Sequence, residues 1–117
     1  MITIKETHKL IHQDMENWSL HLMNFVDDFR YYKDFSAVAE GFAIQDNKFD
    51  PLLASCVEYL CDELNLDWPE WTTDVPVCKK PFFVSGVENL KAMAVLQSPL
   101  TFRIRKIFVL ENFLARC

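Results

Sequence analysis

The stretch from Asp50 to Asn65, DPLLASCVEYLCDELN, carries the clearest helix signal in the chain. The Asp50 carboxylate can accept a hydrogen bond from a backbone N–H of the first helical turn, and Pro51 suits the first helical position because it has no N–H to satisfy. Apolar side chains then recur every three or four residues, which is the spacing of one helix face. They are Leu52 or Leu53, Cys56, Val57, Leu60, Cys61 and Leu64. The stretch therefore predicts a helix from Pro51 to about Asn65 with one buried side.

The segment upstream of this helix shows the same spacing. Thr3 followed by Glu6 is a capping-box pattern, which is typical of a helix start. Apolar residues follow at steps of three and four, namely Leu10 or Ile11, Met15, Trp18, Leu22, Phe25, Val26 and Phe29. We expect one long amphipathic helix, or two shorter helices broken near Gln13, ending around Tyr31 or Tyr32. A further short helix is expected from residue 34 to residue 41, where a glycine suits a left-handed C-terminal cap.

Downstream, prolines interrupt the helical pattern between Leu66 and Val84, in a segment that also holds two tryptophans. A structureless connection of that length is unusual in a compact domain, so we expect an ordered strap pinned by its aromatic side chains. Ser85 and Glu88 repeat the capping-box pattern and predict a helix ending near Pro99. In the segment FRIRKIFVL, residues 102–110, the first four residues alternate apolar and basic side chains as a half-buried strand would, but we interpret the segment as helical.

Composition narrows the fold class. The chain has 117 residues, half of them apolar, and only two glycines, which disfavours disorder and folds built from many tight turns. We therefore predict an all-α protein: one compact domain over residues 1–117, with about four to six helices and an aromatic, proline-containing strap before the C-terminal helices. No apolar run approaches the length of a membrane span, and no secretory signal is visible. We expect a cytoplasmic protein with no membrane contact.

The net charge of −5 hides a division along the chain. Residues 1–78 hold fifteen acidic and five basic side chains (5 − 15 = −10), whereas residues 79–117 hold two acidic and seven basic ones (7 − 2 = +5). A local basic face can bind phosphate or an acidic partner even in an acidic protein. Alternatively, the basic third packs on the acidic part of its own fold. Both interpretations stay open at this stage.

The candidates for metal or catalytic chemistry are few. His8 and His12 lie four residues apart and would share a helix face with Glu16, which is a metal-like arrangement, but no third convergent ligand is recognisable from spacing. We interpret this face as solvated and expect no metal site. His21 stands alone, without a placed nucleophile.

The remaining reactive residues also fit a protein without catalysis. Cys56 and Cys61 read as small buried hydrophobes, and the thiols, including Cys78 and Cys117, are expected to be reduced. Lysines follow Cys78, but no histidine partner pattern supports a cysteine enzyme. Adjacent carboxylates at residues 27–28 and 62–63 point about 100° apart on a helix and are surface charge. No glycine-rich nucleotide motif is present. We expect no catalytic residues and no cofactor.

The basic stretch and the aromatic residues remain as binding candidates. Arg103, Arg105 and Lys106 are predicted either to recognise an anion or partner at the surface or to clamp the C-terminal segment onto the acidic helices. Interleaved aromatic and basic residues could also stack nucleic-acid bases and neutralise phosphates. The aromatic residues predicted to face a partner are Trp68, Trp71, Phe82 and Phe102.

The C-terminal third resembles a family of small bacterial proteins often encoded beside nucleotidyltransferase-like toxins. The resemblance rests on the motif S-P-x-x-F-R-x-R-x-I-F-V, Ser98 to Val109, and on residues that flank it. These are Pro81, Phe82, Leu90, Leu96 and Leu114, with Trp71 extending the likeness upstream. Members often carry an N-terminal helix-turn-helix, and nothing before Pro51 matches one, so autoregulation by DNA binding does not follow.

The resemblance implies an antitoxin-like partner role. We therefore predict a non-catalytic protein-interaction module that binds a protein partner or a second copy of itself. The alternative is a small RNA-binding module that uses the basic C-terminal third, and an uncharacterised enzyme ranks third.

Overall fold

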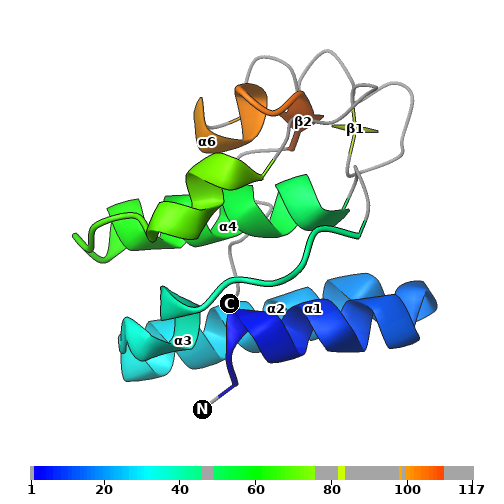
Figure 1. Ribbon diagram of the computed structural model, residues 1–117, viewed down its shortest axis with the longest axis horizontal. Helices are drawn as coiled ribbons and strands as arrows, with labels where there is room; N and C mark the ends of the chain where they lie inside the picture. The colour runs from blue at the N-terminus through cyan, green and yellow to red at the C-terminus, as the bar shows by residue number, and fades with distance from the viewer. Residues whose placement is uncertain (1, 46–48, 76–81, 84–97, 99, 110–117) are drawn as a thin grey trace.

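A computed structural model describes residues 2–45, 49–75, 82–83, 98 and 100–109, and its regular structure is helical apart from two very short strands (Figure 1). The helices are α1 (Ile4–Gln13), α2 (Trp18–Tyr32), α3 (Ser36–Ala39), α4 (Phe49–Glu63) and α6 (Leu100–Arg103). Single 3-10 turns form η1 (Met15–Asn17) and η2 (Glu70–Asp74), and the strands are β1 (Phe82–Phe83) and β2 (Ile107–Phe108). The predicted all-α class is confirmed.

The N-terminal segment forms two helices broken after Gln13, as the second of the two predicted alternatives has it, and not one long helix. The Thr3 hydroxyl accepts a hydrogen bond from the Glu6 N–H, as the capping-box pattern predicts, and α1 begins at the next residue after Thr3. The helix ends at Gln13 because Asp14 leaves the helical region of backbone conformation. After η1 reverses the chain, α2 runs to Tyr32 and is closed by Lys33 in the left-handed conformation.

These helices build a layered core (Figure 1). α1 and α2 lie side by side, α4 packs across them, and α6 with the strand pair lies on the far side of α4. The predicted apolar faces supply the core, including the stacked rings of Phe25 and Phe29. At the surface, the Arg30 guanidinium donates two hydrogen bonds to the Glu63 carboxylate and ties α2 to the end of α4.

Gly41 does not serve as the left-handed helix cap that the sequence predicts. α3 is shorter than expected and ends at Ala39, where Glu40 turns into extended backbone. Gly41 lies instead against the indole of Trp71, and a Cβ atom at Gly41 would come within 2.7 Å of that ring. A glycine is needed here for close approach, not for a positive φ.

The C-terminal segment corrects a second expectation. Residues 102–109 are not one helix: α6 ends at Arg103, a turn closes with Lys106 at a φ of 62°, and β2 follows. β2 pairs in parallel with β1, with Phe82 opposite Ile107. The alternating residues 102–105 form the end of α6 and the turn, so the alternation did not mark the strand, which lies in the apolar run after it.

Several predictions fall on residues that the structure does not describe. These are the helix expected after Ser85, the thiols of Cys78 and Cys117, and most of the prolines of the strap. Within the described ranges, no helix is both long enough and apolar enough to cross a membrane.

Candidate functional site

Arg105 lies inside the protein, with a relative exposure of 6%. Its guanidinium donates two hydrogen bonds to the buried carboxylate of Glu58 in α4, and Nη2 also donates to the Thr72 carbonyl in η2 at 2.7 Å. A planar guanidinium and a carboxylate match each other in this two-bond arrangement. Arg105 is therefore the internal clamp, and the expectation of an outward anion site made of all three basic residues is corrected.

Arg103 and Lys106 are exposed, unlike Arg105. Arg103 is the last residue of α6 and Lys106 lies in the turn after it at a φ of 62°, and neither side chain shares the burial of Arg105. A binding role for these two residues stays a prediction.

The segment from Ser98 to Val109 has a structural role in this chain. The Ser98 hydroxyl accepts a hydrogen bond from the Val109 N–H at 2.9 Å and so joins the two ends of the motif. Of the described positions between these ends, four are buried, namely Thr101, Phe102, Arg105 and Ile107. These motif residues close the C-terminal segment onto α4.

The four aromatic residues expected to face a partner differ in how deeply they are buried. Phe102 is only 1% exposed and packs beside Tyr59, so its assignment to a partner surface is wrong. Trp71 is half-buried and donates its indole N–H to the Val38 carbonyl, and Phe82 is half-buried against the core. Trp68 is 41% exposed and donates its indole N–H to Asp62.

A groove of about 460 Å³ opens beside Trp68, where the C-terminal end of α4 meets α6. Its apolar walls come from Tyr59, Trp68 and Leu100, and Leu100 is 70% exposed. Asp62 and Glu63 add carboxylates to the lining. This groove collects exposed apolar surface next to negative charge.

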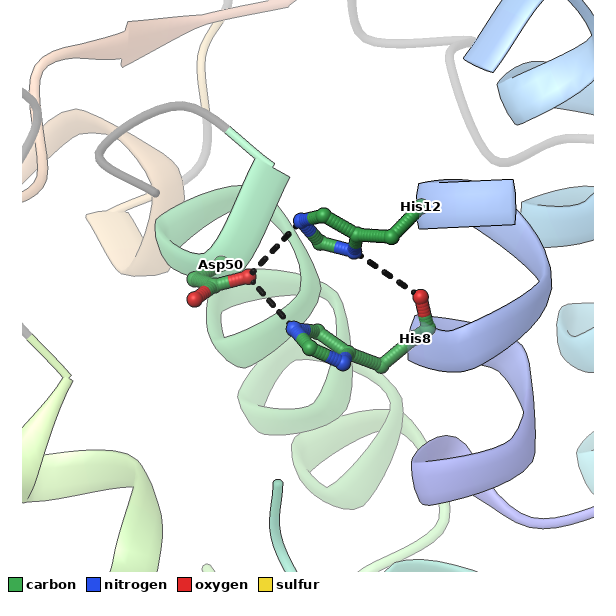
Figure 2. Close-up of side chains that lie close together, drawn as sticks. All are labelled: His8, His12 and Asp50. Atoms are coloured by element: carbon green, nitrogen blue, oxygen red, sulfur yellow. Dashed lines mark hydrogen bonds and ion pairs between the residues drawn. The ribbon is translucent and has the colours of Figure 1, made fainter. Parts of the chain in front are cut away.

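A second cluster joins His8, His12 and Asp50 (Figure 2). His8 and His12 project from successive turns of α1 toward the first turn of α4, where Asp50 lies. His8 Nε2 lies 2.8 Å from Asp50 Oδ1, and His12 Nε2 lies 3.8 Å from the same oxygen. The other carboxylate oxygen of Asp50 accepts the Gln45 N–H at 2.6 Å.

This cluster corrects the interpretation of the histidines as a solvated helix face. His8 is only 4% exposed and stacks on the Phe42 ring, and His12 is half-buried. Glu16, the third member of the predicted face, lies in η1 after the helix break and is exposed. The sequence predicts that Asp50 caps the helix, but Asp50 lies within the first turn of α4 and its carboxylate contacts His8 of α1 instead.

Sequence spacing could not have identified the third member of the cluster. Asp50 lies 42 residues from His8, and the two residues come together only because α4 packs on α1. In the sequence, the one sign of this cluster is the four-residue spacing of His8 and His12.

The cysteines of α4 are buried and unsuited to nucleophilic chemistry. Burial raises the pKa of the Cys56 thiol well above its ordinary value. Burial, followed by the nearby charges of Asp62 and Glu58, raises the pKa of Cys61 to about 11. Both thiols therefore stay protonated near neutral pH, and their assignment as small buried hydrophobes is confirmed.

The chain matches no protein-family model, and no curated protein or solved structure is significantly similar to it.

Proposed function

We propose that this protein is a non-catalytic interaction module that binds a protein partner in the groove between α4 and α6. The observation that carries the proposal is the exposure of Trp68 and Leu100 on the two sides of one groove. Ile104, also exposed, follows Leu100 by four residues, and its N–H donates to the Leu100 carbonyl, so the two side chains share one face. Tryptophan is among the residue types that dominate binding energy when a partner covers them.

The charge around the groove indicates the chemistry of the partner. Asp62 and Glu63 line the groove, and Asp67 is exposed next to Trp68. Two of these carboxylates already make hydrogen bonds, Asp62 with the Trp68 indole and Glu63 with Arg30, so their positions are held. The occupant that fits is a protein segment with an apolar anchor side chain flanked by lysine or arginine.

An antitoxin-like role is the finer form of this proposal, and it rests on the resemblance of residues 98–109. In this chain Phe102 and Arg105 of that motif are buried, so the motif holds α6 in position beside the groove. The motif supports the proposal through the fold of the groove, not through direct contact with a partner.

The test compares affinity purification of the wild-type protein with two matched variants expressed at equal levels. Leu100→Glu places a charge in the groove, whereas Leu20→Glu makes the same change on α2 at a similarly exposed leucine, 54% exposed, outside the groove. Loss of a central apolar contact costs about 2 kcal/mol or more, so binding of the specific partner should weaken about 30-fold in Leu100→Glu. Leu20→Glu should retain it.

Three outcomes contradict the proposal. One is equal retention of every partner by both variants. Another is binding only to RNA, recognised by a steep decrease in affinity as salt rises, because phosphate contacts release counterions. The third is self-association that Leu100→Glu leaves unchanged in sedimentation experiments, with no other partner recovered.

A further inference from the structure

Three side chains that can ligate a metal ion converge beside a cavity that the proposed groove does not include. The ligand atoms of His8, His12 and Asp50 lie within 4.8 Å of one another. The two histidines, together with Gln45, line a cavity of about 390 Å³. We propose that His8 Nε2, His12 Nε2 and an Asp50 carboxylate oxygen bind a Zn²⁺ ion.

The orientation of His12 is the first argument. Its Nδ1 lies 2.9 Å from the His8 carbonyl, which can only accept a hydrogen bond, so Nδ1 carries the proton. Nε2 is therefore the ring nitrogen left to serve as a ligand, and Figure 2 shows this atom directed at the Asp50 carboxylate. A Zn²⁺ ion between them would be bound by this nitrogen and by a carboxylate oxygen.

The bond from Nδ1 to the carbonyl is also an arrangement typical of metal-binding histidines. Such a bond fixes the tautomer and the ring orientation and makes Nε2 a stronger ligand. Here the acceptor is the backbone of the other histidine, one turn earlier on α1, so this helical turn orients the His12 ring, whereas the His8 ring stacks on Phe42.

The distances suit a zinc ion after a small adjustment. Zinc lies about 2.0–2.1 Å from nitrogen and about 2.0–2.2 Å from oxygen, so tetrahedral ligand atoms are separated by about 3.3 Å. The two measured separations from Asp50 Oδ1, 2.8 Å to His8 and 3.8 Å to His12, lie on either side of that value. The shorter one is a hydrogen bond, and it lengthens when the metal ion replaces the His8 Nε2 proton.

The ligand set favours zinc over the harder cations. Two imidazoles and one carboxylate suit Zn²⁺, whereas Mg²⁺ and Ca²⁺ prefer oxygen ligands alone. The cavity leaves space for a water molecule as the fourth ligand. Two lysines line the same cavity. Glu40 neutralises the Lys5 ammonium group at 2.7 Å, and Lys9 is exposed, so solvent and salt screen its charge.

A purely structural hydrogen bond between His8 and Asp50 is the competing explanation. That bond, together with the Gln45 N–H, gives each carboxylate oxygen of Asp50 a donor. The two explanations differ at His12, because a bound ion needs His12 as a ligand whereas the hydrogen bond between His8 and Asp50 does not involve it.

The experiment measures Zn²⁺ affinity of the metal-stripped full-length chain by competition with a fluorescent zinc chelator. His12→Gln removes one ligand at a half-buried position, and His21→Gln makes the same change at a histidine that bonds to Asp14 instead. Loss of an outer contact of a metal ligand already costs about 10-fold to 100-fold in affinity, so loss of a ligand should weaken binding by about 100-fold or more. His21→Gln should bind as the wild type does.

Two spectroscopic readouts keep the proposal testable if His12→Gln fails to fold. In the wild type, Zn²⁺ should shift the Nε2 resonances of His8 and His12 and leave those of His21 unchanged in ¹⁵N NMR. Co²⁺ should give the visible absorption of a four-coordinate site. The groove proposed above lies about 18 Å away along α4, so Leu100→Glu should leave zinc binding intact.

Several results overturn the proposal. They are absence of Zn²⁺ binding, equal affinity of the wild type and a folded His12→Gln variant, and tighter binding of Mg²⁺ than of Zn²⁺. A thiolate-to-cobalt charge-transfer band would place the ion on a cysteine and would equally overturn it.

Discussion

Replacement of Arg105 by alanine should destabilise the protein far more than replacement of its exposed neighbour Arg103. Arg105 joins three separate parts of the chain, because its guanidinium contacts the Glu58 carboxylate in α4 and the Thr72 carbonyl in η2. The variant would leave Glu58, itself buried, without its cationic partner. An uncompensated buried charge is costly because the surrounding protein solvates it poorly.

The magnitude follows from the burial of both partners. Removal of one member of a buried ion pair typically costs about 3–5 kcal/mol. A domain of this size is stable by about 5–15 kcal/mol, so the variant would lose about a fifth of the total or more. The melting temperature should fall by about 10–20 °C, and the urea midpoint by about 2 M for a denaturant slope near 2 kcal/mol per molar. Arg103→Ala should cost less than about 1 kcal/mol because that side chain is exposed.

The assay is urea and thermal unfolding followed by circular dichroism, on wild type, Arg105→Ala, Arg103→Ala and the double variant Arg105→Met with Glu58→Leu. The double variant should recover most of the loss, because it removes both charges and refills the volume with apolar groups. A loss in Arg105→Ala no larger than in Arg103→Ala would refute the clamp. So would a double variant as unstable as Arg105→Ala, since the unpaired charge would then not be the cause.

Two further predictions concern the interior. Gly41→Ala should lower the free energy of unfolding by about 1–3 kcal/mol, because the new methyl group would lie 2.7 Å from the Trp71 ring. Urea unfolding measures this loss, and an unchanged unfolding curve would contradict the contact. Cys56 and Cys61 should resist alkylation at pH 8 until the protein unfolds, as mass spectrometry would detect. Because the folded-state pKa of both thiols is raised, their contribution to stability is full below the unfolded pKa near 9 and declines as pH rises above it. Rapid labelling of native Cys56 would refute its burial.

The sequence by itself determined the main helices, because helix formation depends on neighbours three and four residues apart. The apolar spacing located α4 and the end of α2, and Thr3 with Glu6 marked the start of α1. The same spacing assigned Cys56 and Cys61 to the interior. In each case the side chains that decide the structure are close in the sequence, so their pattern is readable before folding.

Only the tertiary structure decided what the polar residues do. Arg105 could bind outward or inward, and the choice depended on Glu58, which lies 47 residues away. Likewise, His8 acquires Asp50 only through the packing of α4 on α1. Local periodicity does not specify which faces of distant elements meet. Burial and ion pairing depend on the whole packed arrangement, and the residues that pair can lie close together or far apart in the sequence.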